Sequence, residues 1–151
     1  MKTIIAILYA HLVKRQNKKW IDNPIKWQTN TFKKLIKNGI KTEFGKNHDF
    51  ENIKSYDQYK EKVPVRDYEE LRPYIEKVVN GEKDILWPGK PLYFAKTSGT
   101  TSGAKYIPIT KESIKTHIRS ARDALLNYFL KTKNFKPLNG KHMFLQGSPE
   151  L

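Results

Sequence analysis

Residues 93–109 read YFAKTSGTTSGAKYIPI and place a polar loop between two short segments rich in aromatic and β-branched residues. The flanking segments, Tyr93–Lys96 and Tyr106–Ile109, have the composition of β-strands. The loop between them, Thr97–Lys105, combines glycines, hydroxyl side chains and a terminal lysine. Glycines let backbone N–H groups approach an anion closely, while hydroxyls and an ammonium add donors and charge. This composition favours a polyphosphate ligand, and a plain polar turn between two strands is the alternative.

The loop differs from the common nucleoside triphosphate motif, G-x-x-x-x-G-K-[ST]. Counting from Gly99, the second glycine of that motif falls on Ala104, and Lys105 is followed by Tyr106 instead of a hydroxyl residue. That motif also opens a helix, whereas Pro108 forbids a helix interior directly after this loop. Both the spacing and the context exclude this class of loop.

The composition restricts the class of protein. At 151 residues the chain is long enough for one domain with a core. Its formal charge of +14 could indicate a nucleic acid or an anionic membrane as partner. However, only five of its 29 basic residues are arginine, and the lysines are spread along the whole chain, which favours a solvated surface. We therefore expect neither a nucleic-acid partner nor a membrane partner.

The sequence also argues against disulfides, metal sites and a membrane-spanning or signal segment. The absence of cysteine excludes disulfides and thiolate metal sites. The four histidines stand far apart without metal-ligand spacing, so we predict no metal-ligating side chain. The apolar start, Thr3–Val13, is too short to span a bilayer and lacks a small-residue cleavage site. We expect a cytoplasmic protein.

Capping residues and helical periodicity predict a helical first half. Ser55 with Gln58 and Asp67 with Glu70 are spaced as capping boxes, and Thr110 is placed to cap the last helix. The helices are predicted over residues 4–16, 25–37, a short stretch between Ser55 and Val63, 68–80 and 111–131. Pro73 predicts a kink or a later start in the fourth of these.

Apolar stripes predict which faces of two helices are buried. The stripe of the second helix is Trp27, Phe32, Leu35 and Ile36, and that of the last is Ile114, Ile118, Ala121, Leu125, Tyr128 and Phe129. The segment Thr42–Lys46 is predicted as a loop, Trp87–Gly89 as a structural turn, and Lys141–Gln146 as a strand. Because two or three short strands cannot form a self-sufficient sheet, we expect this chain to be the front part of a larger protein. The isolated fragment should then be inactive and only partly folded.

The polar loop resembles the phosphate loop of the adenylate-forming superfamily, whose usual pattern is TSGTTGxPK. The two agree at Thr97, Ser98, Gly99, Thr100, Thr101 and Lys105. They differ at Ser102, Gly103 and Ala104, and these departures point to a branch of the superfamily. The chain is similar to the plant auxin-responsive promoter family of acyl-acid amido synthetases in a series of short motifs. These are Asn23-Pro24, Thr42–Lys46, Val63–Val65, Tyr68–Leu71, Tyr74–Glu76, Gly81-Glu82, Trp87–Gly89 and Lys105–Thr110.

This resemblance implies an α/β fold, with residues 1–151 forming the N-terminal portion of the large adenylate-forming (acyl-CoA synthetase-like) domain. It implies an ATP- and Mg²⁺-dependent reaction in which a carboxylic acid is adenylated, with release of pyrophosphate, and then passed to the amine of an amino acid. Lys105 would be the catalytic residue. The cofactor-binding residues would be Thr97, Ser98, Gly99, Thr100, Thr101, Ser102, Gly103 and Lys105. Two alternatives stay open: an adenylating ligase with a thiol acceptor, and a non-enzymatic basic domain that binds anions or nucleic acid.

Two further sets of residues have a possible chemical role. Arg119 and Arg122 lie about one helical turn apart and could orient the carboxylate of the acid, with surface charge or pairing to Asp123 as the alternative. Ser148 follows Gly147 in a turn, but no G-x-S-x-G pattern supports a nucleophile there.

Overall fold

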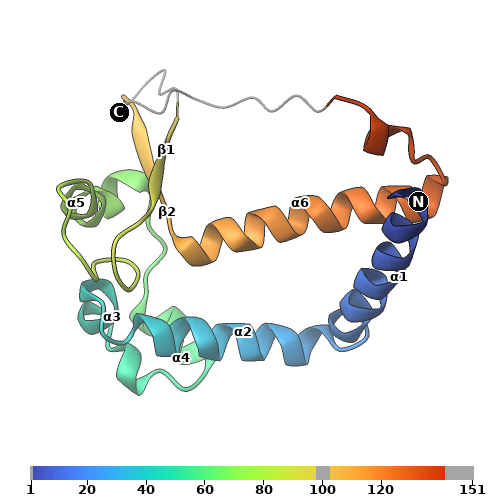
Figure 1. Cartoon of the computed structure of the whole chain (residues 1–151). Helices are drawn as coiled ribbons and strands as arrows, with labels where there is room; N and C mark the ends of the chain where they lie inside the picture. The colour runs from blue at the N-terminus through green and yellow to red at the C-terminus, as the bar shows by residue number, and fades with distance from the viewer. Residues whose placement is uncertain (1, 98–102, 142–151) are drawn as a thin grey trace. The chain divides into compact units, whose positions relative to one another are not determined.

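The computed structural model of the chain describes residues 2–97 and 103–141. The described part is mostly helical and contains one small antiparallel sheet of two strands (Figure 1). The elements in chain order are α1 (Lys2–Ile21), α2 (Pro24–Gly39), α3 (Glu43–Asn47), η1 (Phe50–Asn52), α4 (Tyr56–Lys62), α5 (Tyr68–Val79), β1 (Tyr93–Thr97), β2 (Lys105–Ile109), α6 (Lys111–Thr132) and η2 (Lys136–Asn139). They form two compact units, which are described separately below. One contains residues 25–113 and the other contains residues 2–24 with 114–141.

The unit of residues 2–24 and 114–141 is held by apolar contacts between α1 and the second half of α6. Its buried side chains are Ala10, Val13, Leu126 and Phe129, with Leu130, Phe135 and Leu138 packed against them. Phe129 is fully buried, at 0% exposure. A polar contact reinforces this packing, because Asn17 Nδ2 of α1 donates to Asp123 Oδ2 of α6 at 2.9 Å.

The predicted apolar face of the last helix is confirmed at Phe129, which is buried, but most of the other residues predicted for that face are exposed. Ile118, Leu125 and Tyr128 are exposed, at 65%, 37% and 41%, and Ala121 is also exposed. The buried positions are Leu126 and Phe129, followed by the half-buried Leu130. This i, i+3, i+4 spacing defines the stripe that faces α1, and it is displaced from the predicted one by about a residue. The first helix is also longer than predicted, since lysines in its last turns are good helix formers.

The core of the unit of residues 25–113 lies between α2 and the segment that follows α3. Ile36, Phe50 and Ile53 are buried, and five half-buried side chains pack against them: Phe32, Ile40, Phe44, Tyr59 and Val63. The predicted stripe of α2 is confirmed for Phe32 and Ile36. Trp27 and Leu35 are instead exposed, at 48% and 49%.

The segment Thr42–Lys46 is not a loop, because α3 begins within it. Thr42 is buried and caps α3, since its Oγ1 accepts a hydrogen bond from the Gly45 amide at 3.0 Å. The same hydroxyl donates to the Gly39 carbonyl at 2.7 Å, which ties α3 to the end of α2. A Cβ at Gly45 would lie 1.9 Å from that carbonyl oxygen, so only glycine allows this approach. A glycine that would usually mark a loop therefore marks a close contact between two helices.

Neighbouring segments also bind α3. The amides of Glu43 and Phe44 donate to the carbonyls of Asp84 and Ile85 at 2.8 and 3.0 Å. On the other side, Glu43 forms an ion pair with Lys77 of α5 at 2.7 Å. These contacts satisfy free N–H groups of the first turn of α3 and fix α5 relative to it.

The predicted caps at Asp67, Ser55 and Thr110 are confirmed, but the predicted capping box of Ser55 and Gln58 is incomplete, because the Gln58 side chain bonds to the Lys54 amide and not to that of Ser55. Asp67 and Glu70 form a complete capping box at the start of α5, which continues through Pro73 without a later start. Ser55 caps α4 by accepting from the Gln58 amide, while the Gln58 side chain accepts from the Lys54 amide. Thr110 Oγ1 accepts from the Ser113 amide at 3.1 Å at the start of α6.

The two predicted strands flanking the loop are confirmed, and they pair with each other in antiparallel register. The predicted strand Lys141–Gln146 lies outside the described residues, except for Lys141. None of the described helices combines the length and the apolar character needed to cross a bilayer.

Replacing Gly45 by alanine should destabilise the protein strongly. The added methyl would overlap the Gly39 carbonyl, and both groups belong to backbone that cannot move independently. We expect a loss of about 3 kcal/mol or more in the free energy of unfolding, measured by urea denaturation. Gly140→Ala is the control, because in the described part of the chain the nearest atom to its Cβ, apart from adjoining residues, would be the Pro137 carbonyl oxygen at 3.7 Å. A Gly45→Ala protein as stable as this control would contradict the close contact.

Asp123 should make the stability of its unit sensitive to acid. Burial raises the pKa of this carboxyl, but hydrogen bonds from Asn17 and Arg122 outweigh burial and hold the pKa below its ordinary value of 3.8. Because the pKa is depressed on folding, the stabilisation is complete above that value and is lost as the pH falls through the folded-state pKa. Asp123→Asn should therefore cost about 1–2 kcal/mol near neutral pH and progressively less below about pH 4. Urea unfolding across this pH range measures the difference, and a cost that does not change with pH would contradict the prediction.

Candidate functional site

The polar loop is carried by the β1–β2 pair. The register joins Thr97 to Lys105, so the two ends of the loop are neighbours across the sheet. Of the predicted phosphate-binding residues, the structure describes Thr97, Gly103 and Lys105. The other five lie outside the described residues: Ser98, Gly99, Thr100, Thr101 and Ser102.

Gly103 meets a conformational requirement of this loop. Its φ is +78°, in the left-handed region that favours glycine, and among the described residues other than its chain neighbours no atom lies within 4 Å of the position a Cβ would take. Glycine is therefore favoured here by the positive φ angle of the backbone and not by close packing. The residue is exposed, so the backbone just before Lys105 is accessible from solvent.

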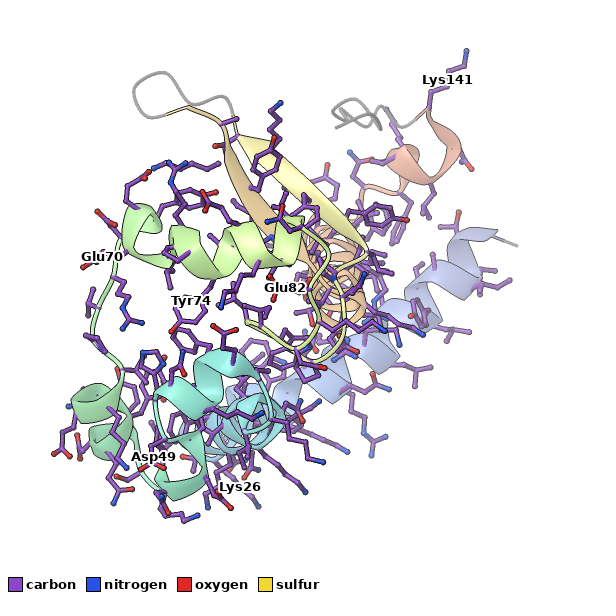
Figure 2. All side chains as sticks on the ribbon, turned by 90° about the vertical axis from the view of Figure 1, so that its left-hand side faces the viewer. Lys26, Asp49, Glu70, Tyr74, Glu82 and Lys141 are labelled. Atoms are coloured by element: carbon purple, nitrogen blue, oxygen red, sulfur yellow. The ribbon has the colours of Figure 1, made fainter. Side chains whose placement is uncertain are left out.

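A tyrosine of α5 holds the start of β2. The amide of Tyr106 donates a hydrogen bond to Tyr68 Oη at 2.8 Å. Tyr68 is the first residue of α5 and follows the N-cap, Asp67. The capping box fixes this end of the helix through two hydrogen bonds of 2.9 Å, one in each direction between Asp67 and Glu70. Figure 2 shows α5 beside the two strands. The base of the loop is therefore attached to the capped first turn of α5.

The Lys105 ammonium also lies against Tyr68. Its Nζ is 5.2 Å from the centre of the Tyr68 ring, within the range of a cation–π contact. Within residues 2–97 and 103–141, Lys105 forms no salt bridge. Its side chain is half-buried. The positive charge is thus held near the loop by a neutral partner and stays available to an anion.

Arg72 borders the same ring from within α5. Its guanidinium carbon is 5.7 Å from the centre of the Tyr68 ring, and Glu69 accepts from its Nε and Nη2 at 2.7 and 2.9 Å. A pocket of about 240 Å³ opens beside these side chains. It is lined by Tyr68, Arg72, Ile75, Glu76, Val79, Asn80, Ala104 and Tyr106. One face of α5 and the end of the loop therefore form a continuous concave surface.

Two residues of this site, Tyr68 and Arg72, were missed in the sequence. Tyr68 belongs to the motif Tyr68–Leu71, which contributed to the family resemblance, and Arg72 lies just after it, but neither stood out as a site residue. Tyr68 is 38 positions from its partner Tyr106, and no periodic signal links a helix start to a distant strand amide. Only the capping box indicated that position 68 would be rigidly held.

Arg122 is engaged elsewhere. Its Nε donates to Asp123 Oδ1 at 2.8 Å and its Nη1 to the Tyr9 hydroxyl at 2.9 Å, so the predicted alternative of pairing to Asp123 is the one observed. Arg119 is exposed. Ser148 lies outside the described residues.

Trp87–Gly89 is a turn, as predicted. The Gly89 amide donates to Asp84 Oδ1 at 2.7 Å, and Trp87 Nε1 donates to Glu112 Oε2 at 3.2 Å. Elsewhere in the described residues, no group of three or more histidine, aspartate or glutamate side chains is arranged to hold a metal ion.

Known proteins resemble this chain over much of its length. A probable indole-3-acetic acid-amido synthetase of Oryza sativa subsp. japonica is 37% identical over 76 residues, which are 48% of this chain and 16% of the relative. A jasmonoyl–L-amino acid synthetase of the same plant is 26% identical over 127 residues, covering 82% of this chain and 21% of the relative. A jasmonoyl–L-amino acid synthetase of Nicotiana attenuata is 24% identical over 128 residues, covering 83% and 22%.

The aligned part of the chain thus spans between 16% and 22% of the length of these relatives. Residues 13–148 match the family model described as the GH3 family N-terminal domain. This match confirms the resemblance to the auxin-responsive amido synthetases. Because the matched residues are most of the chain, the chain belongs to the GH3 family, through the N-terminal domain of that family.

Proposed function

We propose that this chain supplies the triphosphate-binding loop of an ATP-dependent acyl-acid amido synthetase. The observation that carries the proposal is the geometry at the loop's end, where Gly103 has a left-handed backbone and Lys105 holds an unpaired ammonium among the described residues. An exposed backbone next to a free positive charge fits a polyphosphate chain. The names of the relatives, which are amido synthetases, support the same reaction class.

The reaction consumes ATP, a carboxylic acid and an amino acid. The acid attacks the α-phosphorus of ATP to give an acyl-adenylate and pyrophosphate, and the amine then displaces AMP to form an amide. In this proposal Lys105 neutralises the negative charge that grows on the phosphate oxygens in the first step. The hydroxyls of Thr97, Ser98, Thr100, Thr101 and Ser102 donate to the phosphates. Gly99 and Gly103 let the backbone follow the phosphate chain.

Magnesium and a cytoplasmic setting belong to the same proposal. Mg²⁺ is usually held by one or two protein oxygens together with substrate phosphates, so an acidic cluster is not required beside the loop. When bound, it would add positive charge to the triphosphate, while loop hydroxyls are the oxygen ligands that this segment offers. The substrates would be a small carboxylic acid and an amino acid.

Lys105→Ala should abolish most of the adenylation step. We expect carboxylate-dependent ATP–pyrophosphate exchange by the full-length protein to fall about 100-fold or more, the usual effect of removing one preorganised charge donor. Lys96→Ala is the matched control, because Lys96 belongs to the same strand pair but lies over the Tyr106 ring, 5.8 Å from its centre. This control should retain its exchange rate.

Two results would count against the proposal in different ways. Unchanged exchange in the Lys105→Ala protein would remove the role assigned to the lysine. Absence of exchange in the wild type, with acids that include indole-3-acetic acid and jasmonic acid, combined with steeply salt-dependent DNA binding, would favour the basic-domain alternative.

A further inference from the structure

We propose that Tyr68 is a positioning residue that sets Lys105 for anion binding. Its hydroxyl fixes the backbone next to the lysine, and its ring fixes the ammonium. The inference rests on the proposed function of the loop, but it concerns a residue of α5 that lies outside the loop motif. In this proposal Tyr68, the first residue of α5, positions Lys105, which lies 37 residues later in the chain.

The hydroxyl contact fixes the backbone. A two-stranded sheet is only marginally stable in water, so the β1–β2 pair needs an external support to keep its shape. The Tyr106 amide, one residue after Lys105, receives such a support from Tyr68 Oη at 2.8 Å. Successive residues of an antiparallel strand direct their amides alternately to the two sides. Because the Tyr106 amide donates to Tyr68 and not to β1, it is on the side away from β1, and Tyr68 occupies the open edge of β2 at the base of the loop.

The ring contact fixes the side chain. A lysine has four rotatable bonds, and ordering it costs conformational entropy each time an anion binds. The Tyr68 ring lies 5.2 Å from the Lys105 Nζ and reduces this cost by favouring one region of space for the ammonium. A carboxylate in the same place would also hold the lysine but would compete with a phosphate for it. An aromatic ring restrains the charge without neutralising it.

The remaining contacts of Tyr68 keep its ring in place. Its backbone begins α5 directly after Asp67, whose capping box with Glu70 restrains the first turn. Arg72 lies 5.7 Å from the ring centre, and its own charge is paired with Glu69 in the same helix. The second cation near this ring is thus already neutralised. Among the described residues, Lys105 is the cation at this ring that forms no ion pair.

A second tyrosine of α5 gives a matched control. The Tyr74 hydroxyl accepts from Asn47 Nδ2 at 3.0 Å, and its ring meets Phe44 of α3 at 5.3 Å. Figure 2 shows Tyr74 pointing from α5 toward α3. Tyr68→Phe and Tyr74→Phe therefore each remove one hydrogen bond made by a hydroxyl of α5. The bond lost in Tyr68→Phe is to the base of the loop, and the bond lost in Tyr74→Phe is to α3.

The test compares these two variants in the full-length protein by pyrophosphate exchange and by calorimetric binding of an ATP analogue with a methylene bridge between the α- and β-phosphorus. Tyr68→Phe should lower both the analogue affinity and the kcat/KM for ATP by about five- to tenfold, the worth of one hydrogen bond. The KM for the acid should not change. Tyr74→Phe should stay within about twofold of the wild type in every measurement, since it loses a bond of similar worth outside the site.

A double-mutant cycle with Lys105→Ala separates positioning from a general structural effect. If Tyr68 acts through Lys105, adding Tyr68→Phe to Lys105→Ala should reduce analogue affinity by less than about twofold further. Hydrogen exchange of the Tyr106 amide should become faster in Tyr68→Phe and not in Tyr74→Phe. The same affinity loss from Tyr68→Phe with and without Lys105, or no loss at all, would overturn the inference.

The same measurements separate this inference from the proposed function. A wild-type protein that does not bind the analogue, or binds it equally well after Lys105→Ala, would reject the proposed function of the loop. Binding that depends on Lys105 but not on Tyr68 would reject only the positioning role.

Discussion

The unit of residues 25–113 depends on the contacts that Thr42 and Gly45 make with the carbonyl of Gly39. This carbonyl accepts from both the amide and the hydroxyl of Thr42, at 3.0 and 2.7 Å, while Gly45 packs against it without a side chain. This arrangement sets where α3 begins. Through the ion pair of Glu43 and Lys77, α3 then contacts α5, and α5 carries Tyr68 to the base of the loop. A short series of contacts thus connects a glycine at the end of α2 to the proposed phosphate site.

The charge of the chain and the charge of the site have different roles. A net charge of +14 arises from lysines spread over the surface, where salt and solvent screen them. At the loop, one half-buried ammonium lies against an aromatic ring, and in the described part of the chain it has no acidic partner. The location of Lys105 is therefore better evidence for a functional role than the net charge of the chain is. The surface lysines by themselves indicate no particular ligand.

Local signals in the sequence predicted local structure well. The capping residues Asp67, Ser55 and Thr110 were identified correctly because each bonds to an amide three positions away. Predictions failed where distant parts of the chain decide the outcome. Position 45 requires glycine because of its contact with Gly39, and the buried side of α6 is the one that faces α1. For the site, the family motif predicts the loop and Lys105, and this stays a prediction, whereas the Tyr68 contact arises only when α5 and β2 meet.

Pro108 has a consequence for how the small sheet can grow. The Tyr106 amide donates to Tyr68, so residues 106 and 108 of β2 direct their backbone nitrogens away from β1, and proline has no N–H at the second of these positions. Directly after the strand, the Thr110 amide donates to the Ser113 hydroxyl at 2.9 Å. This edge therefore offers no backbone donor to an incoming strand. The carbonyls of residues 106 and 108 remain acceptors on this edge, but a regular antiparallel ladder needs donors as well, so pairing of a further strand along β2 is disfavoured.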